Sequence, residues 1–168
     1  SKEYGSVLHA AAVEGQSAVV EYLLTLPGIH VNLLVDWSQH TALQYAARHG
    51  HSAVCELLLA APGIDVNKAN AAGNTALHYA ARAGRSAACA MLLRAPEIDV
   101  NVADNYGDTA LHYAATAGHS AVCEILLAAP GIDVNIANSY GNTALHCAAK
   151  SGHSAICEML MTKHGINV

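Results

Sequence analysis

The sequence is poor in large aromatic residues and in charge. Its 168 residues include no phenylalanine and a single tryptophan, so aliphatic and small side chains must form any core. Only 12% of the residues are charged, and the net charge is −5. Nucleic-acid binding needs clustered basic residues that neutralise phosphates, so we expect no nucleic-acid partner.

Long apolar runs are also missing, although 53% of the residues are hydrophobic. Glu or Pro interrupts each run before it reaches the roughly 20 residues that cross a bilayer. No stretch has the pattern of a secretory signal peptide. We therefore expect no membrane contact and an intracellular, cytoplasmic protein.

The five cysteines do not form a disulfide pattern. Four of them recur at intervals of 34 residues, at Cys55, Cys89, Cys123 and Cys157. One cysteine at the same place in four of the units indicates a packing position rather than a disulfide framework. This usage is typical of a reducing compartment.

The same interval organises the whole chain. The phrase GNTALHYAA at 73–81 returns as GDTALHYAA at 107–115 and GNTALHCAA at 141–149, with a related HTALQYAA from position 40. Self-similarity at this period indicates a solenoid of stacked units. We expect one domain, 1–168, whose units run approximately over 1–35, 36–69, 70–103, 104–137 and 138–168.

Each unit predicts two short helices and a loop. In the third unit Thr75 is a good N-cap, Gly84 suits a left-handed helix end, and Ser86 can cap a second helix that Pro96 ends. An Asp or Asn with Gly three residues later then favours a type I turn. Helices of about nine residues are too short to be stable alone, so the units must stack on one another.

The repeated unit carries the motifs T-A-L-H-x-A-A, G-H/R-S, two leucines, D-V-N and a D/N-x-x-G turn. In these motifs it resembles the ankyrin repeat family. The resemblance covers nearly the whole chain. It implies an all-α solenoid of five repeats, elongated and curved, with a hairpin-like loop after each helix pair. Two departures are alanine after the capping threonine, where the family usually has proline, and one extra residue per unit, usually proline.

The repeated histidines and cysteines invite a test for catalytic or metal chemistry. His78, His112 and His146 each follow a capping threonine by three residues, where a side chain reaches back to lock the helix start. Three His-x-x-x-Cys pairs place soft metal ligands on one helix face, and Cys147 adds a further ligand in the last unit: His51/Cys55, His119/Cys123 and His153/Cys157. Arg85 breaks that pattern, and free cysteine is usually buried. We expect no catalytic residues, no metal and no cofactor.

The positions that differ between units are the candidates for recognition. They are the loop tips, the residues just after them and the ends of the first helices: Trp37, His40, Arg48, His49, Asn74, Arg82, Tyr106, Asp108, Tyr140, Asn142 and Lys150. The family resemblance implies that these residues line a concave face that grips a partner protein. Exposed Trp, Tyr and Arg dominate interface energetics. Recurring glutamates on the second helices favour an acidic back, opposite a mildly basic groove. We therefore expect a partner segment with acidic and aromatic character.

Two readings of function remain open. The first is a monomeric, non-enzymatic protein-binding module. The alternative is a structural or consensus-like repeat scaffold, or a spacer, with no partner of its own at this segment. Near-identity of units favours the alternative, since segments 51–67 and 119–135 differ at one residue.

Overall fold

A computed structural model describes residues 2–35 and 39–163, with side chains described from residue 7 onward. In the described residues, ten α-helices form five helix–turn–helix pairs. Their bounds are α1 Lys2–Val13, α2 Ser17–Leu24, α3 Ala42–His49, α4 Ser52–Leu59, α5 Ala76–Arg82, α6 Ser86–Leu92, α7 Ala110–Ala117, α8 Ser120–Leu127, α9 Ala144–Lys150 and α10 Ser154–Met161. We number the repeats one to five by their helix pairs.

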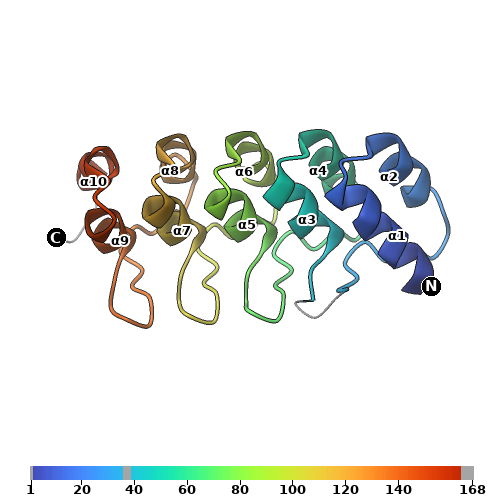
Figure 1. Cartoon of the computed structure of the whole chain (residues 1–168), viewed down its shortest axis with the longest axis horizontal. Coiled ribbons are helices and arrows are strands. Elements are labelled where there is room, and N and C mark those ends of the chain that lie inside the picture. The colour runs from blue at the N-terminus through green and yellow to red at the C-terminus, as the bar shows by residue number, and fades with distance from the viewer. Residues whose placement is uncertain (1, 36–38, 164–168) are drawn as a thin grey trace.

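The pairs stack side by side into an elongated array with its termini at opposite ends (Figure 1). The first helices of the pairs form one layer and the second helices form another. Each helix packs on the corresponding helix of the next repeat and on its own partner. The fold is the all-α repeat solenoid that the sequence predicts.

Loops project from the layer of first helices on the side away from the second helices (Figure 1). We call the loops preceding α3, α5, α7 and α9 the fingers. Where the structure describes them they are hairpin-like, with isolated antiparallel bridges between Val35 and His40 and between Ala103 and Thr109. Trp37, predicted for the first finger tip, lies outside the described residues.

The core is a continuous seam of leucine and alanine between neighbouring repeats. Leu43, Leu77 and Leu111 are at most 2% exposed on the first helices, and the alanine pairs that follow them are fully buried. A buried leucine stabilises a fold by about 1.5–3 kcal/mol. Alanine leaves room for the first helices to pack closely, so repetition of these small contacts replaces the missing aromatic core.

The first helices of repeats two to five begin at capping boxes, which confirms the structural role predicted for the repeated histidines. The backbone N–H of Thr75 donates to Nδ1 of His78 at 3.0 Å, and Thr109 and His112 repeat the bond at 3.2 Å. In the second repeat Oε1 of Gln44 accepts from the Thr41 N–H at 2.9 Å.

The expectation for the second helices was wrong in one respect. The N-cap residue of α6 is Arg85, and its side chain makes no capping bond. Ser86, expected as the cap, is instead the first helical residue. The side chain at this N-cap position bonds to the preceding repeat, as Arg85 does through Nε to the Arg48 carbonyl at 3.2 Å.

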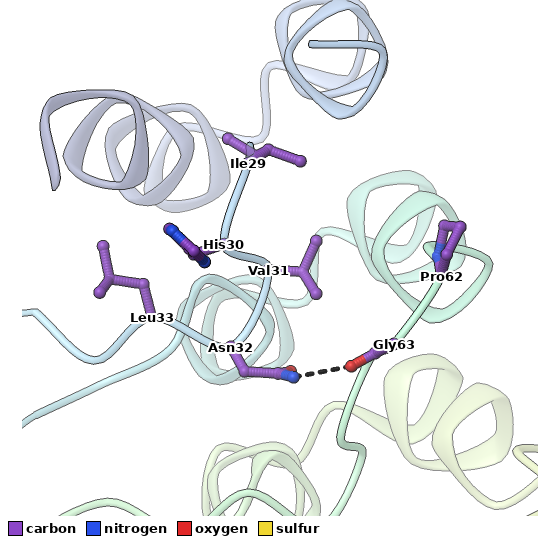
Figure 2. Close-up of a pocket in the computed structure, with 7 residues that line it drawn as sticks. All are labelled: Ile29, His30, Val31, Asn32, Leu33, Pro62 and Gly63. Carbon is purple, nitrogen blue, oxygen red and sulfur yellow. Dashed lines mark hydrogen bonds between the residues drawn. The ribbon is translucent and has the colours of Figure 1, made fainter. Parts of the chain in front are cut away.

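Asparagines tie the loops that follow the second helices. Nδ2 of Asn32 donates to the Gly63 carbonyl at 2.7 Å (Figure 2). Oδ1 of Asn32 accepts from the Asp65 N–H. Asn67 and Asn101 make the equivalent pair of bonds one and two repeats further on. These side chains are therefore structural staples between repeats.

Candidate partner-binding surface

The finger turns are held by their own side chains. The Gly73 N–H donates to the Asn70 carbonyl at 3.0 Å, and Oδ1 of Asn70 accepts from the N–H groups of Ala72 and Asn74. Asp104 and Asn138 build the next two turns in the same way. Neighbouring tips also bond, because the Ser139 N–H donates to the Tyr106 carbonyl at 2.8 Å.

Fixed turns leave the tip aromatics facing solvent. Tyr106 is 58% exposed and Tyr140 is 74% exposed. A large aromatic side chain on a rigid loop loses little conformational entropy when a partner covers it. These two tyrosines are therefore well suited to anchor a partner.

Several first helices end in exposed basic side chains. Arg48, His49, Arg82 and Lys150 are exposed there. The guanidinium of Arg82 lies over the ring of Tyr113, 5.6 Å from its centroid. Nζ of Lys150 donates to Oδ1 of Asn142 at 2.6 Å. We call the fingers and these helix ends together the finger–helix surface.

Four predicted site residues are less open than the tips. His40 and Asn74 are 7% and 9% exposed, and Asp108 and Asn142 are half-buried. Nε2 of His40 lies 2.8 Å from the Tyr79 hydroxyl, and Oδ1 of Asp108 accepts from Asn138 at 2.7 Å. Through these contacts His40 and Asp108 hold neighbouring parts of the finger–helix surface in place.

Three residues near this surface were not among the predicted site residues. Tyr79 lines a hollow beside His40, and Arg85 and His51 lie close to His49. The pKa of His49 lies below its usual value because of partial burial and then the nearby His51, Arg48 and Arg85. The one available signal was Arg85, which replaces a histidine found in three other repeats.

The His-x-x-x-Cys pairs are divided between two structural tasks. Cys55, Cys89 and Cys123 are fully buried, as expected, and burial raises the pKa of each thiol to about 12. Cys157, at the same position of the last repeat, is only half-buried. The histidines are half-buried rather than exposed, and Nε2 of His51, His119 and His153 bonds to a carbonyl of the preceding repeat. Among the described residues, no three His, Cys, Asp or Glu side chains are grouped to hold a metal ion.

A second hollow, of about 710 Å³, lies between the loops of the first two repeats (Figure 2). Ile29, Val31, Leu33 and Pro62 give it mainly apolar walls, with His30 as its one titratable side chain. This lining contains no nucleophile paired with a base.

No helix in the described part of the chain has the length and apolar character needed to cross a membrane.

Comparison with known proteins agrees with this geometry. The family model for ankyrin repeats matches three times, over residues 1–70, 63–138 and 101–168, which together span the chain. A search of curated proteins found no match. The family model, the helix pairs and the projecting fingers all agree, and the chain belongs to the ankyrin repeat family.

Proposed function

We propose that this protein is a non-enzymatic interaction module that binds a partner protein through the finger–helix surface. Ankyrin repeats are generally protein–protein interaction modules. The observation that carries the proposal is the separation of fixed and variable positions. Most residues of the core, the caps and the bonds between repeats recur from repeat to repeat, whereas the residues of the fingers and helix ends differ more.

The exposed members of this surface have the chemistry of protein interfaces. Tyr106 and Tyr140 offer apolar area with a polar tip, and Arg48 and Arg82 offer planar donors. The second helices of the pairs, which we call the outer helices, are more uniform. Their exposed glutamates recur at Glu21, Glu56, Glu124 and Glu158. The varied side chains that specific binding requires are therefore concentrated on the finger–helix surface.

A capture experiment tests the proposal. The immobilised protein, a Tyr106→Ala/Tyr140→Ala variant and a Glu56→Gln/Glu124→Gln variant are each exposed to extract, and bound proteins are quantified by mass spectrometry. We expect the tyrosine variant to lose a specific bound protein that the glutamine variant retains. If only the glutamine variant loses it, the binding surface is on the outer helices.

The structural-scaffold alternative predicts a different result. Repeats that differ so little along the outer helices suit a uniform spacer, and a spacer has no partner of its own at this segment. All three proteins would then retain the same background proteins. Equal thermal stability of the variants is required in either case, so that loss of binding is not loss of fold.

A further inference from the structure

Two arginines of the finger–helix surface border one hollow between the second and third repeats. The hollow has a volume of about 420 Å³ and is lined by His40, Arg48, Tyr79, Arg82 and Ala83. Arg48 stands near the end of α3 and Arg82 at the end of α5, and these two helices pack directly on each other. The stacking of repeats therefore brings two guanidinium groups to the same opening. We call it the arginine pocket.

The polar wall of the arginine pocket is fixed by hydrogen bonds. The Tyr79 hydroxyl accepts from Nδ2 of Asn70 at 2.9 Å and lies 2.8 Å from Nε2 of His40. The His40 ring packs against Tyr45 and Tyr79, with centroids 5.0 and 5.1 Å away. A ligand entering here meets a preorganised wall and does not have to order it.

The two guanidinium groups have no anionic partner among the described residues. Arg48 contributes its carbonyl to a bond from Arg85, and its guanidinium makes no hydrogen bond or ion pair with a described residue. Arg82 lies over the Tyr113 ring, with its Cζ 5.6 Å from the centroid, and its guanidinium makes no hydrogen bond or ion pair with a described residue.

Other basic side chains lie close by. Arg85, His49 and His51 are near Arg48, and Glu14 is the one carboxylate that acts on His49 from this neighbourhood. The corresponding finger of the fourth repeat differs in charge. There Asp104 takes the place of Asn70, and its Oδ2 accepts from the Tyr113 hydroxyl at 2.6 Å. Asp104 and Asp108 lie near Tyr113, as Arg82 does, whereas no carboxylate of a described residue lines the arginine pocket itself.

We infer that the arginine pocket binds a carboxylate side chain, Asp or Glu, of an extended partner segment. The inference rests on the proposed function, because it assigns a chemical class to the partner of that same surface. Two guanidinium groups at one opening match the paired oxygens of a carboxylate and form charge-assisted hydrogen bonds with it. The tyrosine and histidine wall adds polar contacts on one side.

The test uses a defined acidic probe and the full chain. N-acetylated, C-amidated hexaglutamate is titrated into ¹⁵N-labelled protein, and the Nε–Hε signals of the arginines are followed by NMR. Hexaglutamine with the same end groups controls for charge, and inorganic phosphate tests for a general anion site. Arg48→Gln and Arg82→Gln are compared with Arg94→Gln, which removes the same charge from an exposed residue at the end of an outer helix.

We expect saturable shifts at Arg48 and Arg82 with hexaglutamate and none with hexaglutamine. Losing one charge-assisted contact weakens binding roughly tenfold, so Arg48→Gln and Arg82→Gln each lower the affinity by that factor and Arg94→Gln leaves it unchanged. Equal shifts at Arg94, equal weakening by all three variants, tighter binding of phosphate, or no shift at all would each overturn the inference. Such a failure leaves the proposed function standing if the tyrosine variant still loses its partner, whereas equal capture by all variants overturns the proposed function itself.

Discussion

Replacing His78 by alanine tests whether the recurring histidines connect neighbouring repeats. Nδ1 of His78 accepts the Thr75 N–H at 3.0 Å, so the proton of the neutral ring is on Nε2, which donates to the Asp108 carbonyl of the fourth repeat at 3.0 Å. The side chain is 2% exposed. Alanine would leave the buried Thr75 N–H without a partner and create a small cavity. It would also remove one of the two hydrogen bonds to the Asp108 carbonyl, which still accepts from the Asp104 N–H. We expect a loss of about 2–4 kcal/mol in the free energy of unfolding.

Two matched variants separate the cap from the bridge between repeats. In the second repeat Gln44 accepts from the Thr41 N–H and donates through Nε2 to the Asn74 carbonyl at 3.0 Å, so His78→Gln should cost less than about 1 kcal/mol. His146 caps Thr143 but is exposed and has no described bond to another repeat. His146→Ala should therefore cost only about 0.5–1 kcal/mol.

Urea unfolding followed by far-UV circular dichroism measures all three values. Burial lowers the pKa of His78 from its ordinary value of 6.5, so below that pH the unfolded chain takes up a proton that the folded chain does not. Stability is therefore full above about pH 6.5 and falls as the pH drops from there toward the folded-state pKa, and His78→Gln should flatten that fall. A cost for His146→Ala equal to that for His78→Ala would refute the bridging role.

Three further outcomes follow from the packing between repeats. Gly84 has φ +68°, and a Cβ there would lie 2.8 Å from the His119 ring, whereas Gly152 has φ +77° and open space around it. Gly84→Ala should therefore lower the free energy of unfolding in urea by about 1–3 kcal/mol more than Gly152→Ala does. Gln39 has φ +55° where the other fingers have glycine, so Gln39→Gly should raise the melting temperature, by a gain of about 0.5–1 kcal/mol. A thiol reagent at pH 8 should leave Cys55, Cys89 and Cys123 unmodified in the folded protein, because their thiols are buried with a pKa of about 12, and should modify all five cysteines in urea.

Local sequence pattern predicted the parts of the fold that repeat. Thr75 and Gly84 mark the two ends of a helix by their own backbone preferences, and both roles are confirmed. The burial of Cys55, Cys89 and Cys123 was predicted from a spacing that recurs in four of the five units. These features depend on interactions within a repeat or on a contact that every repeat makes in the same way.

What the sequence missed depends on contacts between neighbouring repeats. His40 looked like an exposed residue after a loop tip, but Tyr79 of the next repeat covers it. His51 looked like an exposed helix start, but it bonds to the Val13 carbonyl of the preceding repeat. Side chains supplied by another repeat decide both outcomes, and no local periodicity reveals them.

The hydrogen bonds between repeats run in both directions, and this explains how the surface can vary without loss of the fold. His78 donates forward to the fourth repeat, while His119 of that repeat donates back to the Arg82 carbonyl. Both bonds end on backbone carbonyls, so they do not depend on which side chain residue 82 or residue 108 carries. Recognition residues can therefore change at positions whose backbone holds the stack together. The same backbone contacts keep those side chains in fixed relative positions, which a partner-binding surface requires.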